Sequence, residues 1–138
     1  MISQPIAFPK GLIGFEEEKE FTLIWDQRRA PFHVLETKEG ALSFIMMPVC
    51  EFAPEFQLVP TKEEAQLLSV EESDELVLFA IVTIPSDPSC MSANLQGPVL
   101  VNLSKKLGLQ TIRPEEELRY PILEGYKQNL LKQECPKC

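Results

Sequence analysis

The chain has 138 residues, 44% of them hydrophobic and 25% charged, which is enough sequence to bury a core and indicates a single domain over residues 1–138. Its 21 acidic and 13 basic residues give a net charge of −8. This charge opposes direct binding to nucleic acid and favours a basic protein partner. Because no apolar run approaches the ~20 residues of a membrane span and no secretory leader is visible, we expect a cytoplasmic protein without membrane contact.

Short strands dominate the predicted elements. Residues 37–40 and 104–108 indicate hairpin connections, the second with Gly108 available for a positive φ. The run at 76–82 is apolar on both faces, which predicts a central strand covered on both sides. Because twelve prolines oppose a helical bundle, the pattern predicts an all-β fold, a small β-barrel or sandwich of short, mostly antiparallel strands. The strand-like runs lie at 21–25, 32–36, 42–47, 75–84, 98–103 and 109–113.

The sequence also predicts one or two short helices. Thr61 and Glu64 match the capping box, in which each side chain bonds the backbone N–H of the other residue, so a helix is expected over 61–68. Ile122, Tyr126 and Leu130 recur every four residues, the spacing of one helix face, and predict a second helix near the C-terminus.

Four motifs occur in an order and spacing that point to one family. Residues 8–15, FPKGLIGF, resemble the entry motif F-P-x-G-L-x-G-F of the FliW flagellar assembly factors. Residues 91–102, MSANLQGPVLVN, are similar to that family's M-T-x-N-L-x-A-P-I-x-x-N segment. Residues 31–36 and 78–85 resemble its P-F-x-x-L-Q and L-x-x-I-V-T-V-P strands. On these motifs the chain is identified as a member of the family from residue 8 to residue 123, with 124–138 a variable tail.

The resemblance implies a function that the composition alone does not show. Proteins of this family bind flagellin in the cytoplasm and also bind the translational repressor CsrA, the carbon storage regulator. When flagellin is exported, the freed factor sequesters CsrA, and flagellin translation resumes. The resemblance thus implies a binding factor and not an enzyme, with no cofactor, and a monomer is favoured. The alternative is an OB-like β-barrel that binds nucleic acid or a ligand, which the acidic balance opposes.

The candidate partner surface follows the third predicted strand. Residues 47–56 combine aromatic side chains with carboxylates, as would an interface with apolar anchors inside a charged rim. The family usually has Asp or Asn at the position of Met47, so the sequence departs here from the resemblance. Two interpretations stay open: the phenylalanines contact a partner, or they point into the core. The candidate site residues are Met47, Pro48, Glu51, Phe52, Pro54, Glu55, Phe56 and Asn94, the last as either a partner contact or a turn-capping asparagine.

Catalytic and metal sites have little support in the sequence. His33 is the single histidine and lies in a strand-like run, where a structural role is expected. Cys135 and Cys138 have the spacing of half a zinc site, but a structural zinc site needs four ligands, and Cys50 and Cys90 are far apart in the chain. We therefore expect the terminal cysteine pair to be dispensable and the protein to hold no metal.

Overall fold

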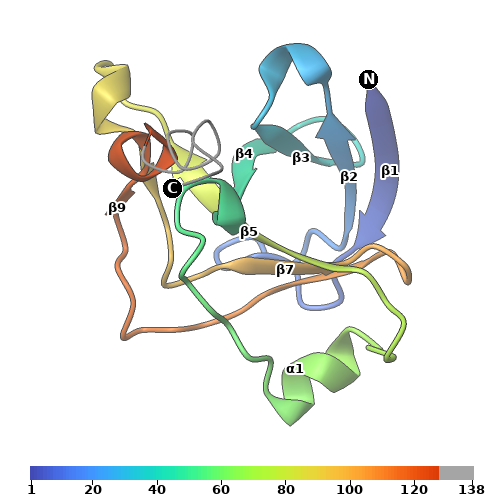
Figure 1. The fold of residues 1–138 in the computed structure, drawn as a ribbon. Coiled ribbons are helices and arrows are strands. Elements are labelled where there is room, and N and C mark those ends of the chain that lie inside the picture. Colours follow the sequence, from blue (N-terminus) through green and yellow to red (C-terminus); the bar gives the residue numbers. More distant parts are fainter. Residues whose placement is uncertain (128–138) are drawn as a thin grey trace.

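Seven strands close into a barrel in the computed structural model, which describes residues 1–127 (Figure 1). Around the barrel they follow the order β4-β3-β2-β1-β8-β7-β5, and β5 pairs with β4 to complete the ring. All neighbours are antiparallel except β1 and β8, which form one parallel pair. The predicted all-β barrel is confirmed. Its strands are β1 (Ile2–Ala7), β2 (Glu20–Trp25), β3 (His33–Thr37), β4 (Ser43–Pro48), β5 (Leu76–Thr83), β7 (Val99–Asn102) and β8 (Leu107–Gln110).

Shorter elements extend from this barrel. The strand β6 (Ser92–Ala93) pairs with the end of β5 and with β9 (Tyr120–Pro121). Residues 122–127 are helical and follow β9 directly, which confirms the start of the second predicted helix, while Leu130 lies outside the described residues. The helix α1 (Lys62–Leu67) lies at the opposite end of the molecule from this helical segment (Figure 1). Three 3-10 turns complete the described elements: η1 (Gln27–Arg29), η2 (Val49–Glu51) and η3 (Pro88–Cys90).

The predicted strands agree with the structure except for the run at 109–113, and the strands β1, β6 and β9 have no predicted counterpart. The run predicted at 109–113 is displaced, because β8 begins at Leu107, directly after the hairpin turn. The strand β1 was not predicted from its sequence, since Pro5 interrupts it and its outward-facing residues are exposed. The two-residue strands β6 and β9 have no periodicity to detect, and only their partners define them.

The strand β5 separates two hydrophobic clusters, as the apolar run at 76–82 predicts. Phe79 points into the barrel core, whereas Ala80 and Val82 point into a second cluster, the outer core. The barrel core contains Ile6, Phe8, Leu12, Phe21, Leu23, Leu35, Met46, Phe79, Val99 and Val101. The outer core contains Met47, Val49, Phe52, Ala53, Ala80, Val82, Ala93, Leu95 and Ile122.

The helix α1 forms where the capping box predicts it. The Thr61 hydroxyl accepts a hydrogen bond from the Glu64 N–H at 3.1 Å, and the Glu64 carboxylate accepts one from the Thr61 N–H at 2.9 Å. Arg113 donates to both Glu64 carboxylate oxygens, at 2.7 and 2.9 Å, and so ties the helix to the segment that follows β8. Buried Asn102 adds a second tie by donating to the Leu68 carbonyl.

The expectation of a positive φ at Gly108 is wrong. The left-handed residue of this hairpin is Lys106, with φ 57°, and Gly108 already belongs to β8. Gly108 is required for space, because a Cβ there would lie 2.7 Å from the Cε1 and Cε2 atoms of Phe8, whose ring is fully buried in the barrel core. The N-terminal glycines Gly11 and Gly14 do adopt positive φ values, 64° and 88°, in the turn that follows β1.

Candidate functional site

Residues 47–56 leave the end of β4 and pass over the outer core through η2. Met47 and Phe52 are each 1% exposed and are members of that core. The Phe52 ring packs against Tyr120, with the ring centroids 5.6 Å apart. Phe56 is half-buried against the same cluster. Phe52 therefore points into the core, and neither it nor Met47 offers a partner any appreciable surface.

The exposed part of this segment is smaller than the sequence suggested. Pro54 and Glu55 are exposed, and Pro48, Glu51 and Phe56 are partly exposed. We name these five residues the 47–56 face. A hollow of about 340 Å³ adjoins them, and its lining is mostly apolar: Val49, Cys50, Pro54, Phe56, Leu76, Val77 and Leu78. The face thus places an apolar hollow beside the carboxylates of Glu51 and Glu55, and its contact with a partner stays a prediction.

Tyr120 shows that carboxylates gather beside this face. Burial raises the pKa of the Tyr120 hydroxyl, and the negative charges of Glu55 and Glu117 raise it further, together with a hydrogen bond to Glu55. Glu55 and Glu117 are 62 positions apart in the chain; Glu117 is a near neighbour of Tyr120 in sequence, and the packing of Phe52 on Tyr120 brings Glu55 to the same side chain. The result is a local negative potential next to the 47–56 face, which a basic partner would favour.

Gly125 fixes the helical residues 122–127 against this segment. A Cβ at Gly125 would lie 3.2 Å from the Phe52 carbonyl carbon and closer still to its oxygen. The backbone of the helical segment therefore approaches η2 as closely as a glycine allows. Sequence reasoning missed this residue, because an isolated glycine in a helical pattern gives no indication of what it packs against.

Asn94 occupies a turn between β6 and β7. Its side-chain oxygen accepts hydrogen bonds from the N–H groups of Gln96 at 2.9 Å and Gly97 at 3.0 Å, which is the turn-capping role considered from sequence. No hydrogen bond among residues 1–127 connects Asn94 to the 47–56 face. Its contact with a partner stays a prediction.

His33 lies on the inner side of β3, at one end of the barrel. Its ring packs edge-on against Phe79, with centroids 5.0 Å apart. Burial lowers the pKa of His33, an effect that the backbone of Pro31 only partly offsets, so the imidazole is neutral at physiological pH. Within residues 1–127 no cluster of three or more His, Cys, Asp or Glu side chains could hold a metal ion. Cys135 and Cys138 lie outside the described residues.

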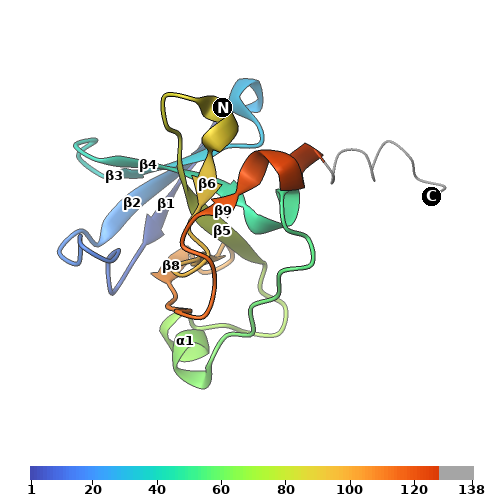
Figure 2. The same ribbon diagram turned by 90° about the vertical axis from the view of Figure 1, so that its left-hand side faces the viewer.

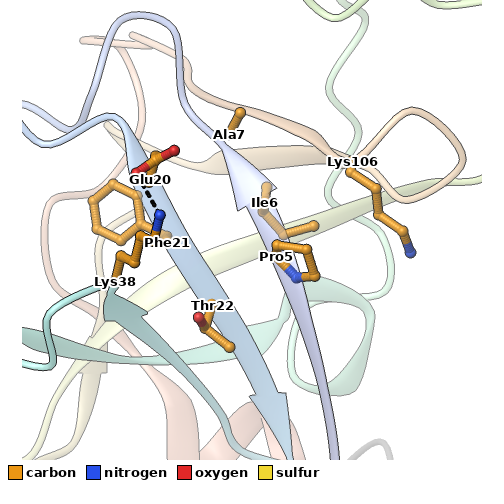
Figure 3. A pocket seen from close by; sticks show the side chains of 8 residues that line it. All are labelled: Pro5, Ile6, Ala7, Glu20, Phe21, Thr22, Lys38 and Lys106. Carbon is orange, nitrogen blue, oxygen red and sulfur yellow. Dashed lines mark ion pairs between the residues drawn. The ribbon is translucent and has the colours of Figure 1, made fainter.

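A second hollow, about 360 Å³ in volume, lies on the outer face of β1 and β2 (Figure 3). Lys38 comes to it from the β3–β4 turn and pairs with Glu20 at 3.4 Å, while Lys106 comes from the β7–β8 turn. Sequence reasoning missed this hollow, because its lysines are distant in the chain and only barrel closure brings them to one strand pair. Its lining residues are Pro5, Ile6, Ala7, Glu20, Phe21, Thr22, Lys38 and Lys106.

Comparison with known proteins identifies the family. The sequence profile described as "FliW protein" matches residues 2–122, which cover the whole barrel and the segment around the 47–56 face. The chain belongs to the FliW protein family. The Flagellar assembly factor FliW of Leptospira interrogans serovar Lai is 38% identical to it over 126 residues, which span 88% of this chain and 84% of that relative. The FliW of Geobacter sulfurreducens is also 38% identical, over 108 residues, 78% of this chain and 67% of the relative.

The fold agrees with a solved FliW structure. A crystal structure described as that of the flagellar assembly factor FliW superimposes with a TM-score of 0.75 at 27% sequence identity, covering 84% of this chain and 82% of that one. The FliW relatives are named for flagellar assembly and not for a catalysed reaction. Across residues 1–127, no helix has the length and apolar character that crossing a bilayer requires.

Proposed function

We propose that this FliW family member binds flagellin in the cytoplasm and sequesters the translational repressor CsrA, and so relieves repression of flagellin translation. The observation that carries the proposal is the family match over residues 2–122. The relatives named above are described as flagellar assembly factors. A factor that couples flagellin supply to flagellin translation is one way to serve assembly, and it requires binding surfaces and no catalysis.

The charge of the molecule supports a basic partner such as an RNA-binding repressor. The net charge is −8, and the negative charges of Glu55, on the 47–56 face, and of Glu117 both raise the pKa of Tyr120. Opposite charges accelerate encounter between two proteins, and salt screens them over a Debye length of ~8 Å at physiological ionic strength. The association rate with CsrA is therefore expected to fall as salt is raised. The 47–56 face is our proposed contact for this partner.

The test uses the full chain with purified flagellin and purified CsrA. Titration calorimetry is expected to show binding to each protein. A gel shift with flagellin leader RNA is expected to show no complex with this protein alone and to show loss of the CsrA–RNA complex when this protein is added. Absence of binding to both proteins would overturn the proposal, and a shift of the RNA by this protein alone would favour the OB-like alternative.

The contribution of the 47–56 face is tested by charge reversal. Glu55→Lys places a cation on the proposed contact and is expected to weaken CsrA binding about tenfold, since a like charge then faces the basic partner. Glu55→Gln retains a hydrogen-bond acceptor for Tyr120 and is expected to have a smaller effect. The matched control is Glu39→Lys, in the β3–β4 turn, which Figure 2 shows on the opposite side of the molecule from residues 49–56. If Glu39→Lys weakened CsrA binding as much as Glu55→Lys does, the effect would come from the net charge in general, and the 47–56 face would not be the contact.

A further inference from the structure

The strand β1 is paired along its full length on one edge only. It pairs with β2 over six residues, from Ile2 with Trp25 to Ala7 with Glu20. On its other edge, among residues 1–127, it has a strand neighbour only at Ala7, whose N–H donates to the Lys106 carbonyl at 2.9 Å. Figure 1 shows the same arrangement: β1 stands at the margin of the barrel, and the β7–β8 hairpin reaches it only near its end.

The register determines which backbone groups this open edge presents. The Phe8 N–H donates toward the β2 side, to Lys19, whereas the Ala7 N–H donates toward β8. Because these groups alternate sides along a strand, Ser3 and Pro5 direct their backbone groups away from β2. Pro5 has no N–H to leave unpaired, as is usual for proline on an edge strand. The N–H of Ser3 and the carbonyls of Ser3 and Pro5 thus form a short template for strand addition.

Two hollows flank this edge, one on each face of the sheet. The inner hollow, about 180 Å³, is the open mouth of the barrel and is lined by Ile2, Gln4, Leu23, Trp25, His33, Val77, Phe79 and Leu103. The outer hollow is the one beside Pro5, Ala7 and Lys106 (Figure 3). Since successive side chains of a strand point to opposite faces, a strand added along β1 would send alternate side chains into the two hollows. Main-chain bonds combined with pockets for alternate side chains are the basis of peptide recognition by strand addition.

The lining of the two hollows defines the chemistry of such a segment. The barrel mouth is mostly apolar and has the size of one large apolar side chain. One polar atom in its wall, His33 Nδ1, is buried without a well-formed hydrogen bond. Lys106 lines the outer hollow, but its ammonium donates to the neutral side chain of Gln4, a residue that lines the barrel mouth, so the cation lies at the open edge between the two hollows. In a molecule of net charge −8, this cation favours a carboxylate on the occupant.

We infer that the open edge of β1 takes up an extended segment of a partner protein as an additional strand. One large apolar side chain of that segment enters the barrel mouth, and an acidic side chain lies beside the Lys106 ammonium at the edge. The surface is distinct from the 47–56 face, which lies on another side of the barrel in both Figure 1 and Figure 2. The inference stands independently of whether flagellin or CsrA is a partner.

Three variants of the full chain remove one part of the site each. Ser3→Pro deletes the outward N–H of an edge residue. Ile2→Trp fills the barrel mouth from a side chain that is 60% exposed and so carries little of the folding energy. Lys106→Glu reverses the charge beside the open edge. The matched charge control is Lys62→Glu, at the start of α1 and far from β1 (Figure 1).

The experiment selects random dodecapeptides displayed on phage against the wild-type chain. We expect enriched peptides to share a large apolar residue and an acidic residue within a few positions of it. Binding is expected to change the fluorescence of Trp25, the single tryptophan, which lines the barrel mouth. Each of the three variants should bind these peptides about tenfold more weakly, with Lys62→Glu unchanged. A thermal melt confirms that each variant is folded. If one variant does not fold, the binding of the other two tests the inference.

Two results would overturn the inference. One is enrichment of no peptide above an unrelated control protein, or of peptides that bind all four variants as tightly as the wild type. The other is a wild-type dimer, seen by light scattering, that Ser3→Pro converts to a monomer, because the edge would then be occupied by a second copy of the chain instead of by a partner segment.

Discussion

Replacing Gly108 by alanine is expected to destabilise the barrel through crowding. The added methyl group would lie 2.7 Å from two carbons of the Phe8 ring, whereas unstrained carbon contacts are about 3.5–4.0 Å. Phe8 cannot simply withdraw, because it is fully buried and its ring packs edge-on against Phe21 with centroids 5.0 Å apart. Either β8 or the ring must therefore shift by roughly 1 Å within a close-packed interior.

The size of this destabilisation follows from two opposing contributions to the free energy of unfolding. Overpacking of a core destabilises a protein by about 1–3 kcal/mol. Replacing glycine by alanine stabilises it by about 0.4–1 kcal/mol, because the unfolded chain has less conformational entropy. The crowding dominates, so Gly108→Ala should lower the free energy of unfolding by about 1–2 kcal/mol. Lys106→Gly is the contrasting substitution, because Lys106 has the positive φ of this hairpin. Glycine relieves the backbone strain of the folded state, which stabilises the protein, but it also raises the entropy of the unfolded chain, which destabilises it. Because the two effects are of similar size, the stability of Lys106→Gly should stay within about 0.5 kcal/mol of the wild type.

Urea denaturation followed by circular dichroism measures these differences, and a double-mutant cycle with Phe8→Leu isolates the contact. If the ring is the obstacle, Gly108→Ala should cost less in the Phe8→Leu background than in the wild type, by about 1 kcal/mol. A Gly108→Ala protein as stable as the wild type would refute the reasoning. So would additive effects of the two substitutions, because the crowding would then involve some other group.

Three further outcomes are expected. Thr61→Ala removes the hydroxyl that caps α1 and should lower the free energy of unfolding by about 1 kcal/mol, whereas Thr61→Ser should preserve it, as chemical denaturation would show. A hydrogen bond from Lys105 lowers the pKa of the Asp74 carboxyl from 3.8 to about 2, so its contribution to stability is fully present above pH 3.8 and is lost as the pH falls toward 2. Asp74→Asn should therefore be less stable than the wild type at pH 6 and approach it near pH 2 in thermal melts, and a constant difference across this range would contradict the assignment. Changing Cys135 and Cys138 together to serine should leave the melt and partner binding unchanged, and stoichiometric zinc lost with this double change would show otherwise.

Local sequence patterns anticipated most elements of the barrel. The apolar runs marked the strands, and the capping box marked α1, because strand alternation and helix capping depend on residues within a few positions of one another. The resemblance to FliW proteins also came from the sequence, through motifs that occur in a particular order, and the expectation that the protein does not bind nucleic acid directly came from its charge.

Which residues of the candidate site are exposed was predicted only in part. Residues 47–56 do run along the surface and do present carboxylates, but Met47 and Phe52 belong to the core. An aromatic residue in a proline-rich connection has the same local pattern whether it faces a partner or the interior. Which side it faces is decided by β9 and residues 122–127, which pack against this segment from more than 60 positions away.

By itself, the sequence determined the strand content, the position of α1, the acidic surface and the family of this protein, since each is a property of composition or of neighbouring residues. Only the tertiary structure decided that Gly108 makes room for Phe8, that Glu55 lies close enough to Tyr120 to raise its pKa, and that β1 closes the barrel with one edge left open. These features depend on contacts between segments far apart in the chain. Such contacts exist only after the barrel has closed, because closure brings β1 beside β8 and β4 beside β5 in one sheet.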